Sequence, residues 1–183
     1  LKPGAGESSR IALVMHIYFE DQIGRCCHYA ANMPQHADIY ITTDNDRKKR
    51  LIEEAFKRLA CGKLQVSVVE NRGRDVGALL MNGRRIIGEY DFICCAHDKK
   101  VSHTPPLRIG QSFAYKCFEN TLASGDYVRN VVRTFEENPR LGLLSPPPPQ
   151  HSVYIQTINN EWEQNFDNTV QLAGRLGLKV DMR

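Results

Sequence analysis

Residues 68–80 read VVENRGRDVGALL and join two segments whose hydrophobic periodicity differs. The segment that ends in this stretch, 64–70, is rich in β-branched residues and predicts a strand. From Ala78 onward, the apolar positions recur at the spacing of a helix. Two arginines, two acids, an asparagine and two glycines lie between these patterns. A strand that leads through a short loop into a helix is the repeating unit of parallel α/β sheets.

The alternation of strand and helix continues on both sides of this loop and predicts the fold class. Three further segments, 10–19, 37–43 and 90–97, are apolar, contain β-branched or aromatic residues, and read as strands. We therefore expect an α/β fold with a mainly parallel sheet flanked by helices on both faces, of Rossmann-like organisation. The other predicted elements are helices at 20–33, after Asp44 or Asn45, at 79–90, near 113–118, near 127–135 and at 158–176, and a short buried strand at 140–145.

Composition places the chain among soluble globular proteins and limits the classes of partner that are expected. Its 183 residues predict one domain over 10–183, preceded by a flexible linker or an expression remnant at 1–9. No run of 18 apolar residues is present, so no membrane span is expected. The net charge of +3 is too small to indicate nucleic acid. None of the six cysteines forms C-x-x-C, which indicates reduced thiols and a cytoplasmic setting.

Polar residues follow three of the four predicted strands. In open parallel α/β sheets, ligands bind beyond the carboxyl ends of the strands, and these ends lie at one rim. The sequence therefore predicts a site assembled from four segments that are far apart in the chain. These segments are HIYF (16–19), TTDN (42–45), ENRGRD (70–75) and AHDKK (96–100).

The NRGRDVG loop (71–77) has the chemistry of a nucleotide contact. Its glycines expose backbone N–H groups, and the helix that follows adds partial positive charge. Arg72 and Arg74 can donate to phosphate or lie against a base, and Asp75 can accept from a ribose hydroxyl. The loop is neither G-x-G-x-x-G nor a P-loop, so a classical dinucleotide or ATP site is not expected. The alternative is a surface turn with an Arg–Asp pair, and the spacing does not decide between the two.

The AHDKK segment emerges from a buried strand and must lie at the rim. Asp98 is a candidate ligand for Mg²⁺ or Mn²⁺, because both ions prefer hard oxygen atoms. His97 is a candidate ligand or hydrogen-bond donor. Lys99 and Lys100 offer charge that would neutralise a pyrophosphate without a metal ion. The alternative is a turn whose lysines are merely solvated.

The first two strand ends allow two interpretations each. A lone histidine such as His16 is more often structural than a ligand contact. Asp44 is either a contact to a base or ribose, or a helix cap. TTDND (42–46) lacks the threonine or valine that a haloacid-type phosphatase motif requires where Lys48 stands. A phosphotransferase or hydrolase that uses Asp44 and Asp98 is therefore disfavoured.

Several segments together resemble the rhamnan synthesis protein F family. They are IALVMHIYF (11–19), ADIYITTD (37–44), ENRGRDVGALL (70–80), YDFICCAHDKK (90–100) and FEENPRLGLLSPP (135–147), and the resemblance covers about 10–182. The family is regarded as one of glycosyltransferases that build rhamnose-rich bacterial surface polysaccharide. It is similar in turn to the GT-A class of sugar-nucleotide transferases, in which an N-x-G loop and helix precede a strand and a DxD motif.

This resemblance implies a GT-A-like donor-binding half that transfers a sugar, rhamnose from dTDP-rhamnose, onto a glycan or lipid-linked glycan acceptor. It also implies other polysaccharide-assembly enzymes as partners, no nucleic acid, and a cytoplasmic location at the inner face of the plasma membrane. Asp98 is the candidate metal ligand. The residues assigned to nucleotide-sugar binding are His16, Tyr18, Thr43, Asp44, Asn71, Arg72, Gly73, Arg74, Asp75, His97, Lys99 and Lys100.

The chain departs from the family pattern in two ways that bear on a metal. The family usually has His-Thr-Lys-Lys where residues 97–100 read HDKK, and the DxD position, 96–98, lacks its first acid. Mg²⁺ or Mn²⁺ is therefore left open as a cofactor, and His97, Lys99 and Lys100 are preferred as a pyrophosphate clamp. Because the family continues beyond the last residue, we expect the catalytic base outside this chain. The alternative function is a non-catalytic binding or assembly module of a polysaccharide biosynthesis complex.

Overall fold

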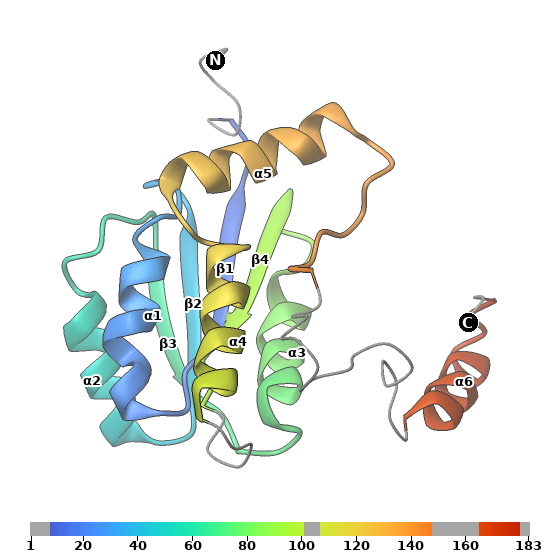
Figure 1. Cartoon of the computed structure of the whole chain (residues 1–183), viewed down its shortest axis with the longest axis horizontal. Coiled ribbons are helices and arrows are strands. Elements are labelled where there is room, and N and C mark those ends of the chain that lie inside the picture. Colours follow the sequence, from blue (N-terminus) through green and yellow to red (C-terminus); the bar gives the residue numbers. More distant parts are fainter. Residues whose placement is uncertain (1–7, 101–106, 148–164, 180–183) are drawn as a thin grey trace. The chain divides into compact units, whose positions relative to one another are not determined.

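The computed structural model of the chain describes residues 8–100, 107–147 and 165–179 (Figure 1). The chain divides into two compact units, Leu1–Pro147 and Pro148–Arg183. The first unit contains the sheet, and the described part of the second contains one helix, α6 (Phe166–Arg175). Within the described ranges, no helix is long and apolar enough to cross a membrane.

A four-stranded sheet with the order β3-β2-β1-β4 forms the centre of the first unit. All its pairings are parallel, which confirms the expected α/β class. Every residue of β1 is buried, because this strand lies inside the sheet and is covered on both faces. The strands are β1 (Ile11–His16), β2 (Asp38–Thr43), β3 (Leu64–Val68) and β4 (Phe92–His97).

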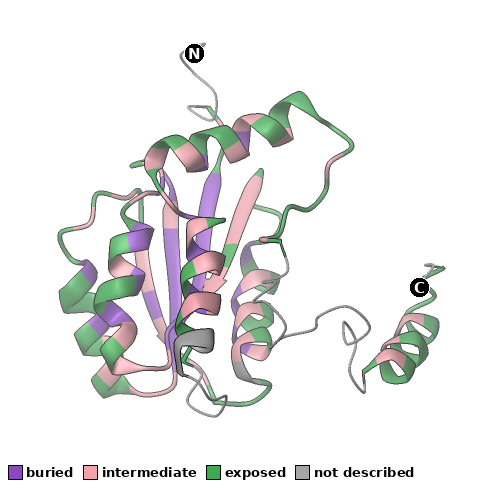
Figure 2. Ribbon diagram, viewed as in Figure 1, coloured by how far each residue is buried: buried purple, intermediate pink, exposed green. Residues whose placement is uncertain are grey.

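One face of the sheet carries the larger hydrophobic core. Leu13 and Met15 of β1 point to this face and are fully buried. Ile52 and Phe56 of α2 and Phe118 of α4 belong to the same core. Figure 2 shows this burial, which is concentrated on the inner strands and on the helix sides that face them. The helices of this face are α1 (Ile23–Ala30), preceded by the 3-10 turn η1 (Glu20–Gln22), α2 (Asp46–Phe56), α4 (Leu107–Glu119) and α5 (Gly125–Glu137).

The other face of the sheet is covered by α3 (Arg74–Ile86). Ile86 and Leu79 of this helix pack with Val14 of β1 and Tyr40 of β2. Helices therefore lie on both faces, as the sequence predicts, but this second core is smaller than the first. The side of α3 that does not pack on the sheet exposes apolar residues, namely Val76, Leu80, Met81 and Ile87 just beyond the helix.

Two sequence predictions need correction or fall partly outside the described residues. The strand predicted at 140–145 is wrong, because 141–147 has no regular secondary structure and Leu143 is 79% exposed. A buried apolar strand needs a neighbouring strand, and in the described residues β4 pairs only with β1. The last helix is confirmed from Phe166 to Arg175, whereas 158–164 lies outside the described residues.

Candidate functional site

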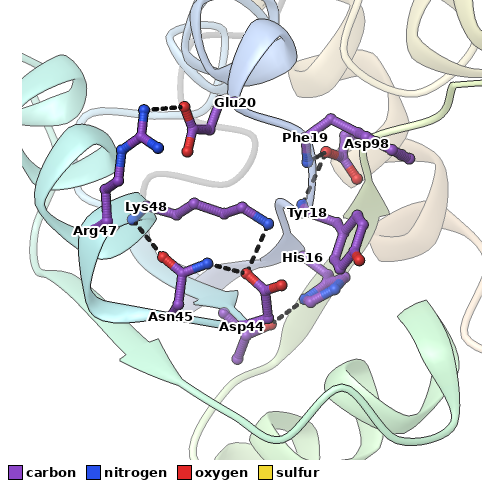
Figure 3. Close-up of polar contacts among 10 residues, drawn as sticks. His16, Tyr18, Phe19, Glu20, Asp44, Asn45, Arg47, Lys48 and Asp98 are labelled. Atoms are coloured by element: carbon purple, nitrogen blue, oxygen red, sulfur yellow. Dashed lines mark hydrogen bonds and ion pairs between the residues drawn. The ribbon is translucent and has the colours of Figure 1, made fainter.

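The carboxyl ends of β1, β2 and β4 lie side by side. The sheet register places His16 opposite Thr42 on one side and opposite His97 on the other. His16 is 5% exposed, and its Nδ1 lies 2.9 Å from Thr42 Oγ1 (Figure 3). Burial lowers the pKa of the His16 imidazole, while the nearby Asp75 carboxylate acts in the opposite direction. His16 is therefore an uncharged, buried side chain at the base of a polar cluster rather than an isolated core histidine.

His97 connects the end of β4 to the first turn of α3. Its Nε2 lies 3.3 Å from Asp75 Oδ2, and its Nδ1 lies 2.7 Å from the carbonyl oxygen of Asp98. Both ring nitrogens therefore face oxygen atoms of neighbouring residues. Asp75 stands in the first turn of α3, so sequence positions 75 and 97 meet at the rim as predicted.

Asp98 fastens the end of β4 to the loop that follows β1. Its Oδ2 accepts hydrogen bonds from the backbone N–H groups of Tyr18 (2.8 Å) and Phe19 (2.6 Å), and its own N–H donates to the His16 carbonyl oxygen. The residue is 5% exposed, and burial raises the pKa of its carboxyl while the two N–H groups act against that rise. These contacts assign Asp98 an anchoring role.

A bound metal ion would need more ligands than Asp98 alone. Among the described residues, no cluster of three or more His, Cys, Asp or Glu side chains is arranged to hold one. One acceptor oxygen of Asp98 is already used by two backbone donors. Binding of Mg²⁺ or Mn²⁺ by Asp98 stays a prediction of the sequence.

The end of β2 leads into an ion pair that the sequence did not predict. Asp44 Oδ1 lies 2.7 Å from Lys48 Nζ, and this ammonium group lies 4.1 Å from the centroid of the Tyr18 ring (Figure 3). Asn45, rather than Asp44, caps α2, because its side chain accepts from the N–H of Lys48. The acid–lysine spacing of four residues at a helix start was the available signal for this pair.

Thr43 is placed differently from the other predicted residues. It follows Ile39 and Ile41 at the alternating spacing of a strand and so points to the larger core. Its Oγ1 is sealed from solvent and has no hydrogen-bond partner in the described part of the chain. Thr42, which the sequence analysis did not select, contacts His16 instead. A nucleotide contact by Thr43 remains a prediction.

The two glycines of the NRGRDVG segment are required by the backbone conformation and packing of that segment itself. Gly73 precedes α3 with φ of 79°, a left-handed conformation that side chains disfavour. A Cβ on Gly77 would lie 2.3 Å from the carbonyl oxygen of Arg72. Asn71, Arg72 and Gly73 are exposed. The side chain of Arg74, the first residue of α3, lies outside the described residues, so its predicted ligand contact is not placed.

The two lysines after β4 diverge. Lys100 Nζ lies 2.9 Å from Asp21 Oδ2 and 5.7 Å from the Phe19 ring centroid, so it borders the loop after β1. Lys99 Nζ lies 5.5 Å from the Phe113 ring centroid, toward α4. Both residues are exposed. An exposed pair such as Lys100–Asp21 contributes little stability, so Lys100 can exchange this partner for another anion at small cost.

The described residues thus bring together the predicted positions at three strand ends and the start of α3. Carboxylates, imidazoles and ammonium groups meet at the carboxyl rim of a parallel sheet. Fold and site together define an α/β protein of Rossmann-like arrangement with a polar cluster at that rim.

The family model of rhamnan synthesis protein F matches residues 2–183. The chain belongs to this family and therefore has a role in rhamnan synthesis. Searches of curated proteins and of solved structures found no match.

Proposed function

We propose that the sheet rim binds the nucleotide diphosphate of a sugar donor, and that the chain is the donor-binding part of a glycosyltransferase. The observation that carries this proposal is the meeting of His16, Asp75 and His97, from three separate elements, at the carboxyl edge of the sheet. Membership of a rhamnan synthesis family supports dTDP-rhamnose as the donor. A glycan or lipid-linked glycan is the proposed acceptor.

Each group at the rim has a proposed part in donor binding. The ammonium of Lys100 donates to the pyrophosphate oxygens. His97 Nε2 exchanges its contact with Asp75 for one of these oxygens, while the Asp98 carbonyl oxygen at Nδ1 keeps the ring in orientation. Asp44 and Tyr18, which share the Lys48 ammonium, face the nucleoside.

The proposed reaction is displacement at the anomeric carbon of the donor sugar. An acceptor hydroxyl oxygen forms the new bond to that carbon, and the bond from the carbon to the phosphate oxygen breaks. The hydroxyl proton passes to a base, and the nucleotide diphosphate leaves with the electron pair. Cations at the rim lower the barrier because negative charge develops on the departing phosphate.

Calorimetry of the intact protein with dTDP, dTDP-rhamnose and UDP, with and without Mn²⁺, tests donor binding. Loss of the charge-assisted hydrogen bonds of His97 in His97→Ala should weaken dTDP binding about 10–100-fold. His28→Ala is the matched control, because His28 is exposed on α1 and should leave affinity unchanged. Absence of binding to all three nucleotides would refute the proposal. Binding only with Mn²⁺ would refute the cation clamp and favour a metal site.

The alternative function, a non-catalytic assembly module, is supported by the exposed apolar side of α3. A partner enzyme of the polysaccharide complex would cover that side. The two functions differ in what the rim residues do. If His97→Ala and Asp75→Asn leave rhamnan synthesis by the intact system unchanged, the module is favoured over the transferase.

A further inference from the structure

A second polar pocket lies away from the strand-end site, between α3 and the amino-terminal half of β2 and β3. Its lining includes Asn82, Arg85 and Glu89 from α3 and the turn after it, and Tyr40, Lys63 and Gln65 from the sheet side. Asn82 stands seven residues after Asp75, which is roughly 10 Å further along the helix axis. The pocket is therefore separate from the proposed donor site.

Apart from Tyr40, Asn82 is the least exposed polar side chain in the lining of this pocket. It is 8% exposed, yet its amide makes no hydrogen bond to any other side chain or backbone group of the described residues. Its neighbours on the same side of α3, Ala78 and Ile86, are buried apolar residues. Its amide atoms are not among the sealed, unpartnered side-chain atoms of the described residues, of which Thr43 Oγ1 is the one example, so the pocket gives the amide access to solvent. The amide lines the pocket and is available to a ligand.

The other polar groups of the pocket indicate which ligand chemistry fits. Lys63 and Arg85 carry positive charge and Glu89 negative charge, so the wall offers both donors and acceptors. Gln65 adds a second amide, whose Nε2 donates to Ser67 Oγ at 3.5 Å and whose oxygen remains as an acceptor. The Tyr40 hydroxyl lies 2.7 Å from that of Tyr90 and is already engaged. A mixed set of this kind matches vicinal hydroxyl groups, each of which donates and accepts, better than it matches a simple anion.

The size of the pocket also points to a small ring. Its volume of about 170 Å³ is smaller than the roughly 300–1,000 Å³ that is typical of sites for drug-sized molecules. Ile86 provides apolar wall against which the C–H groups of a sugar ring can pack, and the Lys63 ammonium lies 5.1 Å from the centroid of the Tyr40 ring. One monosaccharide unit of a longer chain fits this combination of size and lining.

We propose that this pocket is an accessory subsite for one neutral sugar unit of the glycan, held through a bidentate contact to the Asn82 amide. The chain's role in rhamnan synthesis makes a rhamnose unit the natural occupant. Such a subsite tethers the polymer to the protein and raises its local concentration. It does not depend on donor binding at the sheet rim.

Titration of the intact ¹⁵N-labelled protein with a rhamnose trisaccharide tests the proposal. Saturable shifts are expected for the Asn82 side-chain amide and for the backbone N–H groups of Gln65 and Arg85. Asn82→Leu should weaken binding at least tenfold, and Gln65→Ala, at a half-buried position of the pocket lining, provides a second variant should the first not fold. Asn130→Leu, on the exposed side of α5, is the control and should bind as the parent does.

Three results would overturn the proposal. The first is that millimolar trisaccharide causes no shift. The second is that the shifts are unchanged in Asn82→Leu and Gln65→Ala. The third is that inorganic phosphate at equal concentration displaces the sugar, which would indicate an anion site. Because Asn82→Leu should leave dTDP binding intact, failure here is distinguishable from failure of the donor-site proposal.

Discussion

Two glycines of α3 allow a matched test of how the NRGRDVG loop is held. A Cβ on Gly77 would lie 2.3 Å from the carbonyl oxygen of Arg72, which belongs to the backbone and cannot rotate away. A Cβ on Gly83 would meet no atom within 4 Å. Both positions lie in the same helix, so helix propensity favours alanine at each by roughly 0.5–1 kcal/mol. The steric contact therefore decides the difference between them.

We expect Gly83→Ala to stabilise the protein by roughly 0.5–1 kcal/mol. Gly77→Ala should destabilise it by about 1–3 kcal/mol, the usual cost of forcing an extra group into a filled space. At about 2–4 °C for each kcal/mol in a protein of this size, the melting temperatures of the two variants should differ by several degrees. Displacement of the Arg72 carbonyl would also move the loop that leads to Asp75, so Gly77→Ala should weaken dTDP binding as well.

Urea unfolding followed by circular dichroism measures both free energies of unfolding under the same conditions. The slope of free energy against urea should be unchanged, which shows that the same surface unfolds. If Gly77→Ala is as stable as the parent protein, or if Gly83→Ala is the more damaging change, the account of the loop is wrong.

The remaining predictions concern three buried polar groups. Asp98→Ala leaves two backbone N–H groups of the loop after β1 without their acceptor and should cost about 2–4 kcal/mol of unfolding free energy, whereas Asp98→Asn keeps an acceptor and should cost less than half as much. Asp126→Ala, at an exposed position, is the control, and equal losses for all three variants would contradict the anchoring role of Asp98. Thr43→Val removes a sealed, unpaired hydroxyl at nearly constant volume and should leave stability unchanged or raise it by up to about 1 kcal/mol in thermal melts; a clear loss would mean that the hydroxyl has a partner. Because folding lowers the pKa of His16, the unfolded chain binds more protons than the folded protein in weak acid. The free energy of unfolding should therefore be highest above the ordinary pKa of 6.5 and fall as the pH drops toward the folded pKa. Urea titrations at stepped pH should show a smaller fall for His16→Gln, and an unchanged dependence of the free energy on pH would refute this prediction.

The strands and helices of the first unit could be predicted from the sequence because their signals are local. β-Branched and apolar runs predict β1 to β4 within about three residues of their observed ends. Asn45 was one of two predicted caps and is the observed one. The strand predicted at 140–145 failed because a short apolar run carries no information about whether a neighbouring strand is present to pair with it.

The sequence predicted the location of the candidate site at the carboxyl rim of the sheet, but not which side chains contact one another there. The rule for parallel sheets locates the strand ends together, and His16, Asp75, His97 and Asp98 do lie there. The sequence could not show that Asp98 is turned inward to two backbone donors, because that depends on where the loop after β1 passes.

By itself, the sequence determined the order of strands and helices, the parallel α/β class, the family and the rim at which the polar strand ends meet. These properties follow from hydrophobic periodicity, turn chemistry and short motifs, all of which act between residues that are close in the chain. The tertiary structure alone decided that Tyr18 lies beside the Lys48 ammonium, that Thr42 rather than Thr43 contacts His16, and that Asn82 opens into a second pocket. The register of strand against strand and the rotation of each helix on the sheet set those contacts, and both depend on packing between residues that are distant in the chain.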